Sequence, residues 1–132
     1  MQTLVRYRLN RAKESLEEAA LLLESGHANT FVNRLYYGCF YAVSALLLTK
    51  GLSAVRHSGV RVLFHQNIVK PGLLSITQGQ IYDKFFDNRQ RGDYADLTHF
   101  EVQEVRPWLE EARAFVSDVE ALVAREIDRS NP

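Results

Sequence analysis

The chain has 132 residues, of which 46% are hydrophobic and 24% are charged, a composition that suits one globular domain with a single core. Sixteen Lys and Arg residues balance sixteen Asp and Glu residues, which argues against a strongly basic nucleic-acid-binding protein and against a disordered acidic tail. A single cysteine, Cys39, excludes an intrachain disulfide and a cysteine-based zinc site.

Neither the N-terminal segment nor the longest apolar stretch predicts export or membrane insertion. Residues 1–20 carry charges throughout and lack the apolar run of a signal peptide. Residues 31–48 are apolar but are interrupted by Asn33 and Arg34, and we judge the stretch too short and too polar at its start to span a bilayer. We therefore expect a cytoplasmic protein with no membrane partner.

The hydrophobic pattern of the first half of the chain predicts two long helices. The first covers about residues 4–25 and ends at Gly26, and the second covers about residues 29–50, with Asn29 as its N-cap and Gly51 at its end. The second is apolar almost all round, which is typical of the most buried helix of a bundle. Gly38 in its middle lowers helix propensity and indicates a close approach of another helix.

The second half predicts a short helix and two more long ones. The short helix covers about residues 58–68, beginning at Ser58, and a long helix follows over residues 75–88. Residues 89–100 read as a loop, after which Thr98 and Glu101 form a capping box for the last helix. Pro107 predicts either a kink in that helix or its true start. The fold class is all-α, an up-and-down bundle of four long helices plus one short helix in one domain, residues 1–132.

The balanced charge is unevenly distributed along the chain. Residues 25–82 contain five Lys or Arg residues and no acidic residue, a net charge of +5, whereas residues 83–132 contain seven basic and twelve acidic residues, a net charge of −5. Two interpretations stay open: the middle segment excludes carboxylates because it is buried, or it presents a surface that tolerates phosphates.

No motif for a cofactor or a metal is present. The chain lacks a phosphate-binding P-loop, a dinucleotide-binding glycine pattern, a zinc-binding His/Glu pair and a nucleophile elbow. Cys39 lies inside the most apolar helix, where burial would make its thiol inert. We expect no cofactor and no metal.

Three clusters could bind an anion. Arg56 and Ser58 flank His57 at a helix start, a place where free N–H groups bind anions, although Ser58 could serve as a cap only. Arg61 and His65 share a helix face and could bind a phosphate or simply be solvated. The densest cluster runs from Asn88 to Tyr94 and offers two guanidiniums and a stackable ring, although it could also be a solvated loop only. Its members of interest are Arg89, Arg91, Asp93 and Tyr94.

Arg34 stands in the first turns of the buried helix, next to Tyr36 and Tyr37. A guanidinium at such a position must be paired or must reach a cleft. The nearest candidate partners in the sequence are Asp87 and Asp93.

Taken in order, these motifs resemble the HEPN domain proteins, small prokaryotic helical bundles often found beside minimal nucleotidyltransferases. The resemblance covers nearly the whole chain and rests on the opening amphipathic helix, NRLYYGCFYAVSALLLTKGL, RHSGV and RQRGDYADL. It implies a homodimer with a cleft between the subunits. Many members are metal-independent ribonucleases of toxin–antitoxin or defence modules, whose signature is an arginine and a histidine separated by four to six intervening residues.

The sequence departs from that signature because no arginine precedes a histidine with four to six intervening residues. Tyr94 stands where the histidine after Arg89 would be, and a phenol with a pKa near 10 is a poor base. His57 could supply the missing group from another loop. The resemblance therefore implies Arg89, Tyr94 and His57 as catalytic candidates, with a phosphate- or RNA-binding set of Arg34, Arg56, Ser58, Arg91 and Asp93.

Three functional hypotheses follow from these residues and from the resemblance. The first is a dimeric RNA- or nucleotide-binding protein of a toxin–antitoxin or defence module, with metal-independent ribonuclease activity left open by the missing histidine. The second is a non-catalytic helical adaptor that binds a nucleotidyltransferase. The third makes this chain the substrate of nucleotidylation at Tyr94.

Overall fold

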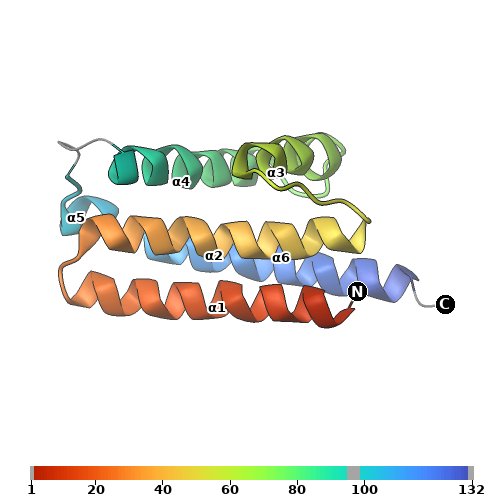
Figure 1. Cartoon of the computed structure of the whole chain (residues 1–132), viewed down its shortest axis with the longest axis horizontal. Coiled ribbons are helices and arrows are strands. Elements are labelled where there is room, and N and C mark those ends of the chain that lie inside the picture. Colours follow the sequence, from red (N-terminus) through yellow and green to blue (C-terminus); the bar gives the residue numbers. More distant parts are fainter. Residues whose placement is uncertain (1, 95–98, 131–132) are drawn as a thin grey trace.

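The computed structural model describes residues 2–94 and 99–130, with the side chains of residues 2–89 and 99–129. The elements are α1 (Gln2–Glu24), α2 (Ala28–Thr49), α3 (His57–Phe64), the π-helix η1 (His65–Val69), α4 (Ile76–Tyr94), α5 (Val102–Val105) and α6 (Trp108–Ser130), and no strand occurs in these residues. The helices α1, α2, α4 and α6 run alternately up and down, while α3 and η1 lie beside α4 (Figure 1). The predicted all-α bundle is confirmed.

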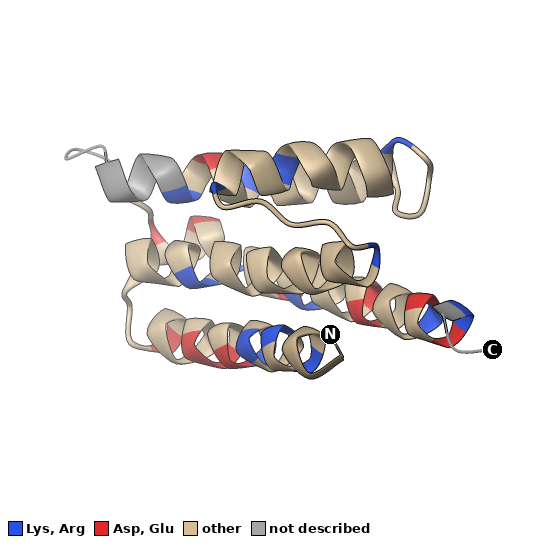
Figure 2. Ribbon diagram, turned by 45° about the vertical axis from the view of Figure 1, so that its right-hand side comes forward, with Lys and Arg blue, Asp and Glu red and all other residues tan. Residues whose placement is uncertain are grey.

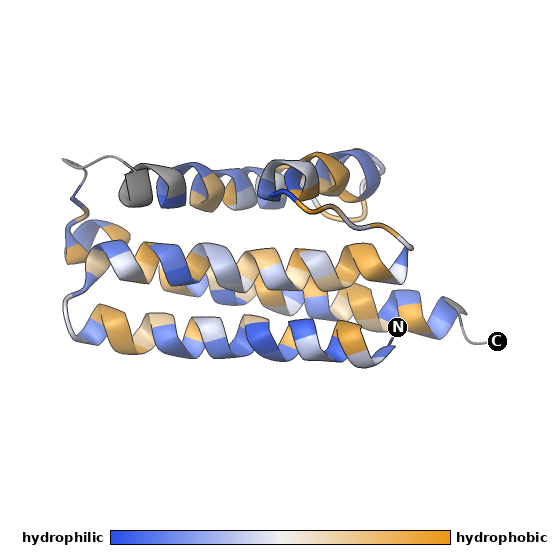
Figure 3. Cartoon of the chain, in the orientation of Figure 1, coloured by the Kyte–Doolittle hydropathy of each residue, from blue (hydrophilic) through white to orange (hydrophobic). Residues whose placement is uncertain are grey.

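Helix α2 is the core of the bundle and contacts α1, α3, α4, α5 and α6. Thirteen of its residues are buried, and apolar residues run along most of its length (Figure 3). By length and composition this 22-residue helix is long enough to cross a membrane, contrary to our prediction that the stretch is too short, with a mean hydropathy of 1.2 over an 18-residue window. However, 67% of that window is buried inside the bundle. Burial against the other helices accounts for its apolar composition.

Gly38 allows α1 and α2 to pack closely, as its position in the sequence predicts. A Cβ atom at Gly38 would lie 2.7 Å from Leu16 Cδ2 and 3.5 Å from the Ala12 carbonyl oxygen. The glycines that end the first two helices adopt positive φ angles, +79° at Gly26 and +72° at Gly51, as expected for residues just after a helix C-terminus.

Several predicted helix ends are wrong by a few residues. The N-cap of α2 is His27, and Asn29 lies inside the helix, where its Oδ1 accepts a hydrogen bond from the Phe100 N–H at 2.9 Å. The N-cap of α3 is Arg56, which makes no side-chain capping bond, so Ser58 is not the cap. The Asn29 side chain bonds to a residue distant in the sequence, so it is not available as a local cap. Arg56 makes no side-chain capping bond, so the sequence carries no capping signal at that position.

Helix α4 begins with a capping box that sequence reasoning missed. The Ser75 hydroxyl accepts from the Gln78 N–H at 3.1 Å, and Gln78 Oε1 accepts from the Ser75 N–H at 2.8 Å, the reciprocal pattern of an S-x-x-Q motif. The helix continues to Tyr94, so the prediction of a loop from residue 89 is wrong at 89–94. Arg and Gln are good helix formers, and one glycine costs about 1 kcal/mol without ending a helix.

The last helix begins at Trp108, directly after Pro107, which decides between the two predicted roles of that proline. Pro107 lacks an N–H donor, so it ends one helix and precedes the next. Glu101 is the N-cap of the separate short helix α5, so the predicted capping box does not open α6. Thr98 lies outside the described residues.

The close packing at Gly38 predicts that substitutions of Gly38 and Leu16 have non-additive effects on stability. In the wild type, Gly38→Ala gains helix propensity of about 1 kcal/mol but forces Leu16 to move. In a Leu16→Ala background the obstruction is gone, so the same substitution should stabilise the protein. We expect G38A to be about 1–2 kcal/mol more favourable in L16A than in the wild type, measured by urea denaturation. Equal effects in both backgrounds would contradict the close contact.

Candidate functional site

Side chains from α2 and α4 meet at the tyrosine pair Tyr36 and Tyr37. Arg89 of α4 donates from Nη2 to the Tyr37 hydroxyl at 3.2 Å. Its guanidinium carbon also lies 5.4 Å from the Tyr36 ring centroid and 5.5 Å from the Tyr37 ring centroid, within cation–π distance of both rings. Packing of α4 against α2 thus holds the arginine over a polar and aromatic surface.

His57, the first residue of α3, reaches the same tyrosine pair from another direction. Its Nδ1 lies 3.1 Å from the Tyr36 hydroxyl, and its ring stacks on Phe40 with centroids 4.4 Å apart. The Tyr37 ring presents its edge at 5.8 Å. The sequence predicts His57 and Arg89 as candidates for one site without showing that they are close. The structure places both of them around Tyr36 and Tyr37.

Burial sets the protonation states of Tyr36 and His57. It raises the pKa of the Tyr36 phenol to about 12, so the hydroxyl keeps its proton at neutral pH. Burial and then the positive charge of Arg89 lower the pKa of the His57 imidazole, which keeps that ring neutral. A neutral ring that accepts the Tyr36 proton at Nδ1 carries its own proton on Nε2 and can present it to a ligand.

Arg34 is paired, but with neither of the predicted carboxylates. Its Nη1 lies 3.3 Å from Glu18 Oε1 on α1, and its guanidinium carbon lies 4.9 Å from the Tyr37 ring centroid. Asp87 is bound elsewhere, and the side chain of Asp93 is outside the described residues. The correction follows from topology, because α1 packs along α2 and brings Glu18 to Arg34. The Arg34 Nε atom is buried and makes no hydrogen bond within the described residues.

Of the remaining predicted site residues, the structure describes the side chains of two and not those of the other three. Arg56 and Ser58 are exposed beside His57, and neither side chain forms a hydrogen bond or ion pair within the described part of the chain. The side chains of Arg91, Asp93 and Tyr94 lie outside the described residues, so their predicted roles stay predictions.

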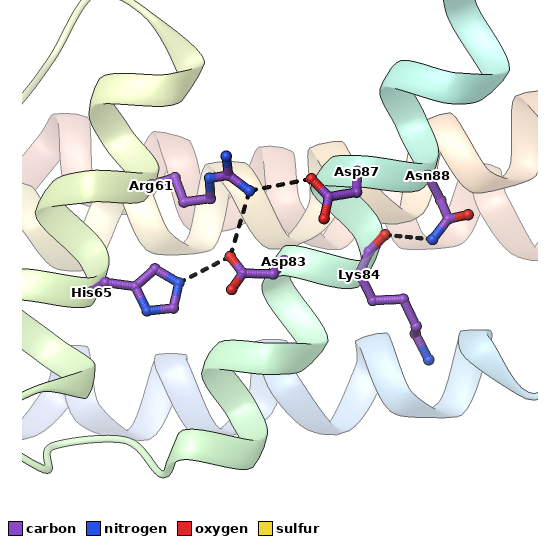
Figure 4. A network of polar contacts seen from close by, with 6 residues as sticks. All are labelled: Arg61, His65, Asp83, Lys84, Asp87 and Asn88. Carbon is purple, nitrogen blue, oxygen red and sulfur yellow. Dashed lines mark hydrogen bonds and ion pairs between the residues drawn. The ribbon is translucent and has the colours of Figure 1, made fainter. Parts of the chain in front are cut away.

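The second predicted pair, Arg61 and His65, is engaged by carboxylates of α4 (Figure 4). Arg61 Nη1 lies 3.2 Å from Asp87 Oδ1 and 3.8 Å from Asp83 Oδ1, and His65 Nε2 lies 2.9 Å from Asp83 Oδ1. Arg61 also covers the Phe86 ring, 3.9 Å from its centroid. Two carboxylates beside one guanidinium disfavour a phosphate there, and the network joins α3, through Arg61, and η1, through His65, to α4.

Sequence reasoning missed the aromatic residues beside this site. Phe40 and Tyr41 are half-buried, and the Tyr41 ring lies 6.0 Å from the Tyr37 ring. Arg11 of α1 sits over Tyr41, with its guanidinium carbon 5.3 Å from the ring centroid. The available signal was the helical spacing of Arg34, Tyr37 and Tyr41, which puts them on one face of α2.

Among the described residues, no group of three or more His, Cys, Asp or Glu side chains could hold a metal ion. Burial raises the pKa of the Cys39 thiol far above its usual range, in agreement with the predicted inert cysteine. The described side chains that meet at the tyrosine pair are those of Arg89, His57 and Arg34.

Residues 5–122 of the chain match the HEPN domain. The chain belongs to the HEPN family. A UPF0332 protein of Thermotoga maritima is 41% identical over 122 residues, which are 92% of this chain and 92% of the relative. Two proteins of Methanocaldococcus jannaschii, each named "Putative toxin", are 30% and 32% identical over 83% and 86% of this HEPN chain and over 74% and 79% of their own lengths.

The surroundings of His57 predict that the pKa of its imidazole lies below that of an ordinary histidine. By NMR, we expect His57 to titrate below the ordinary histidine pKa of about 6.5, because burial and Arg89 disfavour the imidazolium. Arg89→Met removes the positive charge but keeps bulk, so the titration point should move upward. A pKa of 6.5 or more in the wild type, or a fall in the variant, would contradict this arrangement.

Proposed function

We propose that this HEPN protein binds single-stranded RNA or a nucleotide at Arg34, Tyr37, His57 and Arg89. It would act as the toxin-like component of a toxin–antitoxin or defence module in the cytoplasm. The observation that carries the proposal is the convergence of Arg89 and His57 on one tyrosine pair. Two relatives named "Putative toxin" support the biological setting.

The groups at the site match the parts of a nucleotide. Arg34 and Arg89 both lie near Tyr37, with guanidinium carbons 4.9 Å and 5.5 Å from its ring centroid, and guanidiniums bind phosphate bidentately. The half-buried Tyr37 ring offers a surface on which a base can stack, an interaction worth about 1–3 kcal/mol. The Nε2–H of neutral His57 supplies a hydrogen-bond donor.

The same groups could support slow cleavage of RNA without a metal. In that reaction the 2′-oxygen attacks the phosphorus, the bond to the 5′-oxygen breaks, and a 2′,3′-cyclic phosphate and a 5′-hydroxyl result. Arg89 would stabilise the charge on the phosphoryl oxygens. In the tautomer whose Nδ1–H donates to the Tyr36 oxygen, His57 would accept the proton of the 2′-hydroxyl at Nε2 and then give it to the leaving 5′-oxygen. His57 suits this task better than a tyrosine of ordinary pKa, since a neutral imidazole accepts protons near pH 7.

A homodimer would reconcile the neutral composition with a phosphate ligand. The basic segment 25–82 carries the residues Arg34 and His57 of the site, whereas the excess of carboxylates lies after residue 82. Two copies that face each other through this region would pool their positive charge in one cleft while the assembly stays neutral overall. A nucleotidyltransferase is the proposed partner protein, following the resemblance.

RNA binding tests the proposal through Arg89→Ala, with Arg125→Ala as the matched control because Arg125 is an exposed arginine of α6. We expect R89A to weaken the binding of a fluorescent single-stranded RNA at least about 10-fold, measured by fluorescence anisotropy. The variant loses one charge-assisted contact to a phosphate and the guanidinium that lies beside the Tyr37 ring on which a base stacks. R125A should bind like the wild type.

Salt and cleavage complete that test. Binding should weaken as salt rises from 50 to 300 mM, since each phosphate contact on a single strand contributes about 0.7 to the slope of log affinity against log salt. Cleavage in EDTA, if present, should be lost in R89A and in His57→Gln. Salt-independent binding, or R89A binding and cutting like the wild type, would overturn the proposed site and favour the non-catalytic adaptor.

A further inference from the structure

The proposed nucleotide site continues along α2 toward α1 as a line of contacting aromatic rings and arginines. Tyr37 contacts Tyr41, with ring centroids 6.0 Å apart, and Arg11 lies over Tyr41 at 5.3 Å. Arg8 is one helical turn before Arg11 and therefore on the same face of α1. We name the set Arg8, Arg11, Arg34, Tyr37, Tyr41 and Arg89 the arginine–aromatic track.

We infer that the arginine–aromatic track binds a single strand of about three nucleotides, with Arg8, Arg11 and Tyr41 holding the part of the strand beyond the Arg89 end. The inference rests on the proposed function and adds a second, separable subsite to it. Proteins commonly bind single-stranded nucleic acids with aromatic rings that are flanked by cationic side chains. Every base has a π-face that can stack on such a ring, and every nucleotide linkage has a phosphate that a cation can bind.

The length of the track exceeds one nucleotide. From Arg34 to Tyr41 the helix advances seven residues, or about 10 Å at ~1.5 Å per residue. Consecutive phosphates of a stacked strand advance about 3.4 Å along the axis. A mononucleotide therefore occupies one end of the track, whereas a strand of about three nucleotides reaches both ends.

The charges along α1 favour the same ligand. The first half of α1 is basic and its second half is acidic (Figure 2), and no carboxylate precedes Glu14 in the sequence. Arg8 forms no ion pair within the described residues, so it has a charge to offer a phosphate. The exposed residues of this half include Tyr7, which is 59% exposed.

The carboxylates near the track do not block it. Arg11 pairs with Glu14 at 3.0 Å and Arg34 pairs with Glu18 at 3.3 Å, but the Glu14 and Glu18 side chains are 56% and 50% exposed. Ion pairs with such exposed groups are weak and screened by salt. A phosphate that binds the arginine bidentately can replace them, while each released glutamate returns to water.

The test compares ligand length with variants of the far end. The ligands are AMP and 2′-O-methyl oligoadenylates of three and nine nucleotides, whose methylated 2′-oxygens prevent cleavage. For the wild-type chain we expect affinity to rise steeply from AMP to the trimer and little beyond it. The double variant Arg8→Ala/Arg11→Ala should bind the trimer and nonamer about 10-fold or more weakly, with a salt slope smaller by about 1.4 for two lost phosphate contacts.

Matched variants distinguish loss of this subsite from misfolding and from loss of binding at the Arg89 end of the track. AMP binding should be unchanged in R8A/R11A, and R125A should match the wild type for every ligand. Tyr41→Phe should keep the affinity for the trimer because it keeps the ring, whereas Tyr41→Ala should lose it. Circular dichroism verifies that each variant is folded, and if Y41A is not, R8A/R11A still decides the question.

Each other outcome has a distinct meaning. Binding of AMP and RNA by the wild type with unchanged trimer affinity in R8A/R11A would overturn the track and leave the proposed function standing. A wild-type chain that binds no AMP and no oligonucleotide would overturn the proposed function itself. If R8A/R11A or Y41A changes the sedimentation coefficient from dimer to monomer, the face is an interface between two copies, and the track is overturned.

Discussion

The burial of α2 on nearly all sides is the constraint on which the rest of the structure depends. An apolar helix of 22 residues can be hidden only if other helices surround it, and α1, α4 and α6 do so as a bundle. Gly38 lets α1 approach so closely that a Cβ atom would meet Leu16. The same close approach brings Glu18 to Arg34 and Arg11 to Tyr41, so a packing requirement also fixes the polar contacts along that face.

The polar groups near the core show how the bundle accommodates tyrosine and histidine side chains beside its buried helix. Tyr36 is fully buried but its hydroxyl has a partner in His57, and the two shifted pKa values keep both groups uncharged at neutral pH. The charge lies on Arg89, which is half-buried at the edge of the same cluster. A neutral interior with a charged rim avoids the cost of burying an unpaired ion.

The charge distribution gains a meaning in three dimensions that it lacks along the chain. Part of the carboxylate-free segment is buried, as one interpretation held, because α2 alone accounts for much of it. The other interpretation stays a prediction, and the residues it concerns, Arg34 and His57, lie with Arg89 around Tyr36 and Tyr37. In contrast, Arg61 of the same segment is paired with two carboxylates of α4. The fold thus pairs Arg34 with one carboxylate and Arg61 with two, so the excess positive charge of the segment is neutralised to a different extent at each arginine.

The sequence by itself determined the class of the fold and the identity of its core helix, because helical periodicity, an apolar stretch and glycine stops are local signals. It also determined the family, through motifs that occur in a fixed order. Only the tertiary structure decided that Arg34 pairs with Glu18 and not Asp87, that α4 continues past residue 89, and that His57 and Arg89 contact the same tyrosine pair. These are contacts between residues 16 or more positions apart, or a helix extension through a glycine, and no local pattern specifies which distant side chain packing will bring near.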